Sequence, residues 1–238
     1  MVVNSPTSKK HMKVTYYGHS SFGIEIAGKH LVFDPFISPN PLASAIKLNA
    51  IKADYILISH AHQDHTADVP FLAEHTGATL VACHEVGVDF HKKGFEKCVR
   101  MNVGGAFSAD GITIKAVTAI HSSSFADGSY GGIAMGFVVS AKEGSFYYAG
   151  DTGLTYDMKL IGESGTPLKF ALLPVGDVFT MGIDDAIRCT DFIKCDNVIG
   201  MHYDTFEPIK VNKEEASKKF EQAGKKITFM AIGETREF

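Results

Sequence analysis

The sequence contains no long hydrophobic run and no excess of positive charge. Its longest apolar stretch, Ile133 to Ala141, has about half of the 18 or more residues that a membrane helix needs. The 23 lysines and arginines are outnumbered by 27 aspartates and glutamates, and the net charge is −4. These absences argue against a membrane protein and against binding of nucleic acid through a basic face.

Cysteine is also scarce, and the few cysteines are not paired in the sequence. None of the four lies in a CxxC motif of the kind that indicates zinc or redox chemistry: Cys83, Cys98, Cys189 and Cys195. Residues 1–11 have no apolar core of the kind found in signal peptides, and we expect them to form a polar, mobile tail. We therefore expect reduced thiols and a cytoplasmic protein.

The remaining composition is that of an ordinary globular protein, with 45% hydrophobic and 21% charged residues in 238 positions. This length is ample for one large core but short for two full-sized domains, so we expect residues 12–238 to form a single domain. One count is unusual, because 11 residues are histidine. Histidine is the commonest metal ligand and a frequent acid–base catalyst.

Hydrophobic patterns predict two halves with a similar order of elements, each passing from antiparallel strands to alternating strands and helices. Strands are predicted over 13–17, 22–26, 30–33, 55–58, 79–82, 112–118, 133–139, 145–148, 170–173, 197–200 and 227–230. Helices are predicted over 66–75, 86–93, 154–161, 184–193 and 213–223. The simplest architecture is an α/β fold: an αββα sandwich of two mixed sheets with helices on the outer faces.

Several histidines cluster in the segment Ser59–His65, directly after a buried apolar strand. His60 and His62 are two residues apart in extended backbone, so both side chains project to one side and can reach one cation. Asp64 and His65 fall at the start of the following helix, where they can hold a second cation. Four potential ligands in six residues favour a metal site over a loop of locally bonded histidines.

The motif His60-x-His62-x-Asp64-His65 resembles the signature of the metallo-β-lactamase superfamily. The resemblance implies the fold of that superfamily and three further ligands in a fixed order. These are matched by His121, Asp151 and His202, each just after a predicted strand. By resemblance, the first cation is held by His60, His62 and His121, the second by Asp64, His65 and His202, and Asp151 bridges the two.

Imidazole and carboxylate ligands suit several divalent ions. We expect two of them, with zinc first and manganese, iron or nickel as alternatives. Such ions lower the pKa of bound water from about 15.7 toward about 7, so that a metal-bound hydroxide can attack at neutral pH. We therefore expect a dinuclear metal-dependent hydrolase of a small ester, lactone or phosphodiester. Its partner would be a small-molecule substrate, with anions among the candidate classes.

Residues beside the motif are candidates for further roles. Asp34, at the end of the third strand, is expected to accept the second N–H of a metal-bound histidine. The Gly18–Phe22 and Pro174–Gly182 segments resemble one branch of the superfamily, which contains L-ascorbate-6-phosphate lactonase and uncharacterised metal-dependent hydrolases. That resemblance implies that His19 contacts the substrate or acts as a general acid; the alternative is a structural histidine. Asp64 is the second catalytic candidate, as a shuttle for the water proton.

Two loops are candidates for the substrate pocket. Asp177 and Thr180 lie in the glycine-rich loop after an apolar strand. The loop 122–132 carries Phe125 and Tyr130, and it is either a lid over the site or an ordinary solvent loop. The other histidines have no ligand-like neighbours and are predicted to be incidental: His11, His30, His75, His84 and His91.

Two other function classes stay open. A nucleic-acid-processing enzyme of the same superfamily, such as a tRNA endonuclease, is disfavoured by the net charge of −4 and by the lack of a long basic arm. A non-enzymatic metal-binding protein with a decayed site is disfavoured by the complete set of ligands. The sequence does not choose the substrate, the metal or the oligomeric state.

Overall fold

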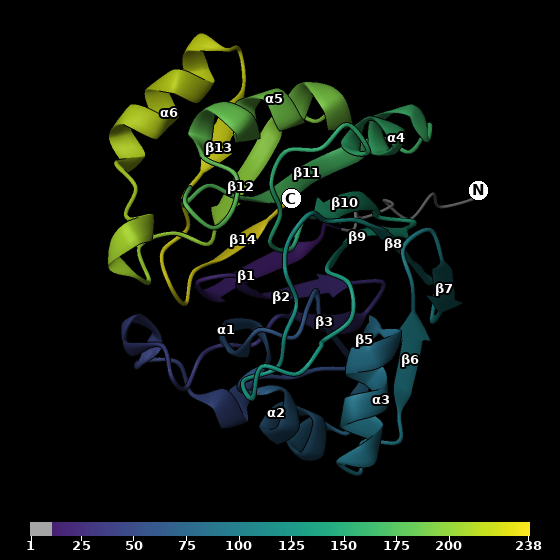
Figure 1. Ribbon diagram of the computed structural model, residues 1–238. Helices are drawn as coiled ribbons and strands as arrows, with labels where there is room; N and C mark the ends of the chain where they lie inside the picture. Colours follow the sequence, from purple (N-terminus) through teal and green to yellow (C-terminus); the bar gives the residue numbers. More distant parts are fainter. Residues whose placement is uncertain (1–10) are drawn as a thin grey trace, which may run out of the picture.

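The computed structural model describes residues 11–238 and shows two sheets that face each other, with helices on both outer sides (Figure 1). The strand order is β14-β1-β2-β3-β4-β5-β6 in the first sheet and β13-β12-β11-β10-β9-β8-β7 in the second. Both sheets combine parallel and antiparallel pairs, so the predicted αββα sandwich is confirmed. Of the predicted tail, only His11 lies within the described residues, and it is exposed.

The first sheet comes from the N-terminal half of the chain and the last strand. Its strands are β1 (Lys13–Gly18), β2 (Ser21–Ile26), β3 (Lys29–Phe33), β4 (Tyr55–Leu57), β5 (Thr79–Cys83), β6 (Cys98–Met101) and β14 (Thr235–Glu237). Its helices are α1 (Gln63–Thr66), α2 (Val69–Thr76) and α3 (His84–Lys92), with 3-10 turns at Pro41–Ala43 and Leu48–Ala50. Figure 1 shows α2 and α3 below this sheet, on its outer side.

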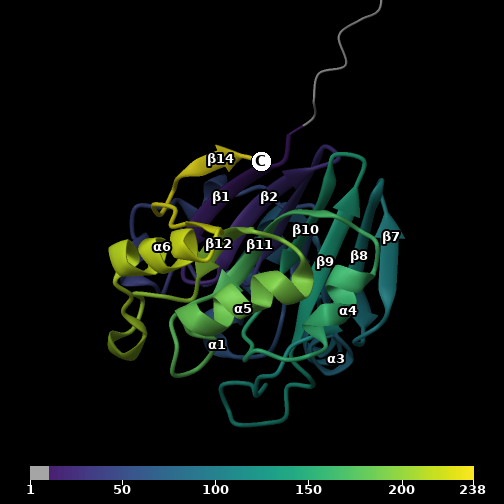
Figure 2. The same cartoon turned by 90° about the horizontal axis from the view of Figure 1, so that it is seen from above.

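The second sheet and its helices follow. The strands are β7 (Ala106–Ala109), β8 (Ile112–Thr118), β9 (Met135–Ala141), β10 (Gly144–Tyr148), β11 (Leu168–Pro174), β12 (Asn197–Met201) and β13 (Lys226–Thr228). The helices are α4 (Met158–Glu163), α5 (Ile183–Ile193) and α6 (Lys213–Gln222), with a 3-10 turn at Glu207–Ile209. Figure 2 looks down on these three helices over the sheet. No helix in the described part of the chain has both the length and the apolarity to cross a membrane.

The core lies between the sheets, where aromatic rings from both sides meet. Phe33 of β3 packs against Tyr148 and Phe146 of β10, with ring centroids 4.6 and 5.9 Å apart, and all three are fully buried. Side chains alternate along a strand, so Tyr147 points to the opposite face of the second sheet, where it is equally buried. Burial on both faces explains the continuous apolar pattern of these strands. All four cysteines carry free thiols.

Three strands were not expected from the sequence, and two helices start or end elsewhere. The unexpected strands β6, β7 and β14 all lie at sheet edges, where short strands form by pairing with a neighbour and show weak alternation. The predicted helix over 66–75 is two helices, α1 and α2. The ring of Pro70 would collide with the carbonyl group of Thr66, so the first helix ends there. The predicted helix over 154–161 begins only at Met158, because its first residues form a turn.

The strands that precede the predicted ligands all run in the same direction within their sheet. β1 and β3 are each antiparallel to β2, and β3 is parallel to β4. β8 and β10 are each antiparallel to β9, and β10, β11 and β12 are parallel. The carboxyl ends of these strands therefore lie together at one end of the strands in each sheet, which is where α/β folds place their sites.

Candidate metal centre

Three histidines converge where β4 and β8 end. His60 and His62 follow β4, and His121 follows β8. The Nε2 atom of His60 lies 2.9 Å from Nδ1 of His62, and one nitrogen of each of the three rings lies within 4.8 Å of the others. His60 is fully buried, whereas the other two rings are partly exposed. The fold thus brings together the residues predicted for the first cation.

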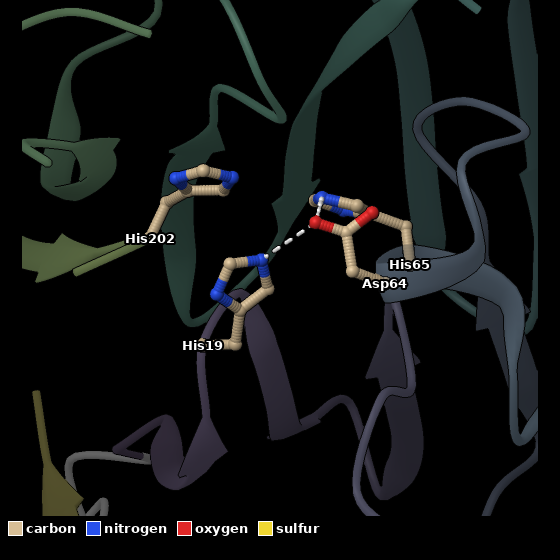
Figure 3. Close-up of side chains that lie close together, drawn as sticks. All are labelled: His19, Asp64, His65 and His202. Carbon is tan, nitrogen blue, oxygen red and sulfur yellow. Dashed lines mark hydrogen bonds and ion pairs between the residues drawn. The ribbon is translucent and has the colours of Figure 1, made fainter. Parts of the chain in front are cut away.

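A second group lies beside the first, and its side chains point toward one another in Figure 3. Asp64 and His65 belong to α1, and His202 follows β12. His19, which follows β1, lies with them: one ligand atom of each of the four residues is within 4.8 Å of the others. The Nε2 atom of His19 is 3.1 Å from Oδ2 of Asp64. The structure therefore adds His19 to the group predicted for the second cation.

Asp151 lies between the two groups. It follows β10, and its Oδ2 atom is 2.9 Å from Nε2 of His202, 3.2 Å from Nε2 of His65 and 3.6 Å from Nε2 of His121. Its other carboxylate oxygen is buried without a hydrogen-bond partner among the described residues. A carboxylate that reaches histidines of both groups is in the position required of a bridging ligand.

The backbone is strained at three residues of the centre. The angle φ is +55° at His19, +41° at Asp34 and +55° at His202, a left-handed conformation that residues other than glycine rarely adopt. Each residue comes directly after a strand, so the strain turns its side chain into the centre at a cost of about 1–3 kcal/mol. Gly150 also has a left-handed backbone, with φ of +62°, and its lack of a side chain lets the chain pass close to Ser59. A Cβ atom there would lie 2.8 Å from Cβ of Ser59.

Asp34 orients His65 directly and His60 through Ser59, by hydrogen bonds on the side of the rings away from the centre. Its Oδ2 atom accepts hydrogen bonds from Nδ1 of His65 and from the hydroxyl group of Tyr148, each with a donor–acceptor distance of 2.8 Å. Ser59 donates to the same carboxylate, and its Oγ atom lies 2.9 Å from Nδ1 of His60. These contacts keep the Nδ1 protons in place and leave both Nε2 lone pairs for a cation. The expected hydrogen bond between Asp34 and one of the candidate ligand histidines, His65, is present, while the role of His65 as a ligand stays a prediction.

The electrostatics of the two groups differ. Burial lowers the pKa of all three histidines of the first group, so their rings are neutral at pH 7. Burial alone would raise the pKa of Asp151, but His65 and His202 hold it well below its ordinary value. Burial alone would lower the pKa of His65, and the carboxylates of Asp151 and Asp34 raise it instead. A cation must therefore displace a proton from His65, and its affinity falls at low pH.

The donor set fits divalent cations. Buried polar atoms are normally hydrogen-bonded, yet Oδ1 of Asp151 has no hydrogen-bond partner among the described residues. Within the same residues, Nε2 of His65 makes ion-pair contacts of 3.2 Å with Asp151 and 3.8 Å with Asp64 but no well-aligned hydrogen bond. Both atoms lie where imidazole and carboxylate groups from the two sheets converge, a combination that suits zinc, manganese, iron and nickel. The local chemistry of the centre thus supports metal binding.

A cleft of about 540 Å³ opens onto the centre. Its polar lining consists of His62, Gln63, Asp64, His121, Ser122, Asp151 and His202, and its apolar lining of Phe36, Phe179, Phe206 and Pro208. None of these apolar residues was predicted from the sequence to line the pocket. The signal that indicates Phe36 and Phe206 is their position, a few residues after Asp34 and His202 in the same loops.

The structure places the predicted pocket residues outside the cleft. Phe179 lines it, whereas its neighbours Asp177 and Thr180 do not. The carboxylate of Asp177 instead accepts a hydrogen bond of 2.8 Å from the backbone N–H of Val178. The loop 122–132 reaches the cleft only through its first residue, and the ring of Tyr130 is 68% exposed rather than folded over the site. A lid function of that loop stays a prediction.

His19 is sealed from the cleft by two aromatic rings. The centroid of its ring lies 5.7 Å from that of Phe36 and 5.4 Å from that of Phe206, and its side chain has no exposed area. Burial lowers the pKa of His19 to about 4, so the ring is neutral. The neutral ring can then donate a hydrogen bond from Nε2 to Asp64 at 3.1 Å and accept one at Nδ1 from the hydroxyl group of Thr205 at 3.0 Å. A catalytic role of His19 stays a prediction; Asp64, its partner, does line the cleft.

The contacts of Asp34 lead to a testable expectation. Asp34→Asn should weaken metal binding about 10- to 100-fold, because an amide group cannot accept all the hydrogen bonds that orient His65 and Ser59. Competition with a chromophoric chelator measures this affinity. Asp184→Asn is the matched control, since the Asp184 side chain is 78% exposed and pairs with the surface residue Lys219, away from the cleft. Equal affinities of the two variants would contradict the role assigned to Asp34.

Comparison with known proteins agrees with this geometry. Residues 29–203 match the family model described as a beta-lactamase superfamily domain. The chain is 51% identical over 226 residues to a UPF0173 metal-dependent hydrolase of Flavobacterium johnsoniae, covering 95% of this chain and 100% of the relative. A second UPF0173 metal-dependent hydrolase, from Christiangramia forsetii, is 48% identical over 227 residues, with the same two coverages.

A solved structure agrees as well. Igni18, a metallo hydrolase of the hyperthermophilic archaeon Ignicoccus hospitalis, has a TM-score of 0.87 and 37% identity to this chain, covering 96% of this chain and 99% of Igni18. Both the family model and the relatives span most of the chain, including the segment 60–65 and the strand ends that carry the other ligand candidates. The chain therefore belongs to the metallo-β-lactamase superfamily and is one of its metal-dependent hydrolases.

Proposed function

We propose that this hydrolase is dinuclear and cleaves a small ester, lactone or phosphodiester. The observation that carries the proposal is the position of Asp151. Its Oδ2 atom lies 2.9 Å from His202 in one ligand group and 3.6 Å from His121 in the other. One carboxylate within reach of both groups favours two adjacent cations over a single one.

Zinc is the first candidate for these cations, and manganese, iron and nickel suit the same ligands. Two bound cations would lower the pKa of water from about 15.7 toward about 7 and polarise the bond that breaks. The first would be held by His60, His62 and His121, the second by Asp64, His65 and His202, with Asp151 between them. His19 would be a further neighbour of the second cation, because one of its ring nitrogens lies within 4.8 Å of ligand atoms of Asp64, His65 and His202.

Asp64 is the group of the chain best placed to move a proton. Burial would raise its pKa, but the hydrogen bond to His19 and the nearby histidines hold it below the ordinary value, so the carboxylate is ionised at neutral pH. It lines the cleft and can accept a proton from water and pass it to the leaving group. His19 acts here as a positioning residue, because it touches Asp64 and not the cleft.

The cleft supports a small-molecule substrate. A volume of about 540 Å³ lies within the range of roughly 300–1,000 Å³ of small-molecule sites. Among residues 11–238, no lysine or arginine lines the cleft, whereas a nuclease needs basic groups along the phosphate backbone. The complete ligand set argues against a decayed, non-enzymatic site.

The proposal is tested by metal analysis combined with a substrate screen. We expect about two divalent ions per chain after loading and turnover of at least one lactone, ester or phosphodiester such as bis-p-nitrophenyl phosphate. Chelation should abolish the turnover, and added metal should restore it. One ion per chain would contradict the dinuclear site. Metal binding without turnover would favour a binding protein, and salt-sensitive RNA cleavage would favour the nucleic-acid alternative.

A further inference from the structure

The apolar side of the cleft, rather than its metal centre, indicates the class of substrate. We propose that the group attached to the scissile bond is uncharged and apolar, an aryl or branched alkyl group, and that Phe36, Phe179 and Phe206 receive it. This inference rests on the proposed function, because it assigns a substrate class to the same cleft. It restricts any negative charge of the substrate to the bond that is cleaved.

Phe36 and Phe206 form a continuous aromatic wall at the centre. Their ring centroids are 6.4 Å apart, and both rings pack on His19, which lies behind them. Phe36 is 8% exposed and Phe206 is 37% exposed, so the wall continues from the buried centre to the surface. A substrate group that leaves the metal centre in this direction meets aromatic carbon.

The loop that carries Phe36 is held rigidly. The carboxylate of Asp68, which is buried, accepts hydrogen bonds from the backbone N–H groups of Ile37 over 2.6 Å and of Ser38 over 2.8 Å. Asp68 itself lies between α1 and α2, next to the ligand segment. The wall is therefore fixed relative to the metal ligands, as a specificity surface must be.

Phe179 is presented by a strained loop. Asp177 and Val178 both have a left-handed backbone, with φ of +61° and +58°, and for a branched residue such as valine this conformation is a marked outlier. The backbone N–H of Asp177 donates to the carbonyl group of Met181 over 3.1 Å and closes the loop. Phe179 lines the cleft although it is 51% exposed. Strain that holds an exposed aromatic ring at the mouth of a site is typical of a functional contact.

The cleft, as far as residues 11–238 line it, offers no lysine or arginine to an additional anionic group. Its described lining instead includes Asp64 and Asp151. The lysines nearest in sequence to Phe206 are already paired: Lys210 with Glu207 over 2.6 Å, and Lys213 with Asp204 over 2.8 Å. A phosphate or carboxylate placed beyond the scissile bond would lose hydration without gaining a cation.

Hydroxamates test this inference, because they bind metal through a constant group and vary in their side arm. Acetohydroxamate, phenylacetohydroxamate and succinohydroxamate carry a methyl, a benzyl and a carboxyethyl arm. Isothermal titration calorimetry on the metal-loaded protein measures their affinities without turnover. Contact of one phenyl ring with the wall removes about 60 Å² of apolar surface from water, so the phenyl compound should bind about tenfold more tightly than the methyl compound.

Variants of Phe206 locate the effect. Phe206→Ala should reduce the tenfold preference to about threefold, and Phe206→Leu should keep most of it, because leucine retains apolar area. Phe206 lies on the surface of a loop, so both variants are expected to fold. Tyr156→Ala is the control: Tyr156 is an aromatic residue that is 71% exposed and does not line the cleft. The Tyr156→Ala variant should prefer the phenyl compound over the methyl compound by the same factor as the unchanged protein.

The outcomes separate this inference from the proposed function. If all three hydroxamates bind equally, or if the succinyl compound binds most tightly, the apolar substrate class is wrong while the metal centre stands. A preference that survives Phe206→Ala unchanged would likewise overturn the role of the wall. If none of the compounds binds and metal analysis finds no bound ion, the proposed function and this inference both fail.

Discussion

The variant His62→Ala is expected to hydrolyse substrate at least about 1,000-fold more slowly than the unchanged protein. Loss of this histidine would weaken the hold on the cation proposed for the first group, and the activation of water that such a cation supplies is worth several kcal/mol, or about three powers of ten in rate. His62 is the suitable position because its ring is partly exposed and lies in the connection before α1. Its replacement therefore leaves no cavity in the core.

The measurement is kcat/KM on a substrate from the screen, together with metal content and circular dichroism. His91→Ala serves as the control, because His91 is an exposed residue of α3 outside the cleft. It should keep full activity and full metal content. Near-normal hydrolysis by His62→Ala, with normal metal content, would show that the ligand assignment is wrong.

The metal-free protein is expected to have a free energy of unfolding about 4 kcal/mol lower than the same protein in a solution that contains free metal at about 1,000 times its Kd. For a chain of this size the melting temperature should fall by about 10 °C. The reason lies in the position of the candidate ligands: His60 and His65 lie in the segment that follows β4 of the first sheet, whereas Asp151 and His202 follow β10 and β12 of the second sheet. A cation held by both groups links the two sheets and binds only the folded chain tightly.

Differential scanning calorimetry with and without a chelator measures this shift. The shift should shrink as the pH falls, because protons compete with the metal for His65, whose pKa is raised by Asp151 and Asp34. His62→Ala should show a smaller shift than the unchanged protein. Identical melting temperatures with and without chelator, at a pH where metal is bound, would contradict a cation that links the sheets.

Much of the fold was accessible from hydrophobic pattern alone. Strands such as β4 and β11 are compact apolar runs because each is buried on both faces, by helices on one face and by the opposite sheet on the other. Such runs can be recognised in a sequence without a structure. The edge strands β6, β7 and β14 were not predicted, because a short edge strand depends on its neighbour more than on its own residues. The break between α1 and α2 was missed although Pro70 marks it.

The candidate ligands were accessible for a different reason. His60, His62, Asp64 and His65 are close in the sequence. The spacing of the first two places them on one side of extended backbone, and the other two fall at the start of the next helix. His121, Asp151 and His202 were found through a resemblance, since nothing local joins residues so far apart. The direction of β8, β10 and β12 explains why these positions meet: all three strands end at the same edge.

The residue types and spacing of the segment His60–His65 were enough to indicate a metal site, because the ability to bind a cation is a property of each side chain and neighbours in sequence reveal a local cluster. The surface that surrounds this candidate site could be seen in the folded chain alone. Phe36, Phe179 and Phe206 come from three separate loops, and His19 is sealed behind two of them. Burial and adjacency of this kind depend on how the two sheets pack, and no short stretch of sequence contains that information.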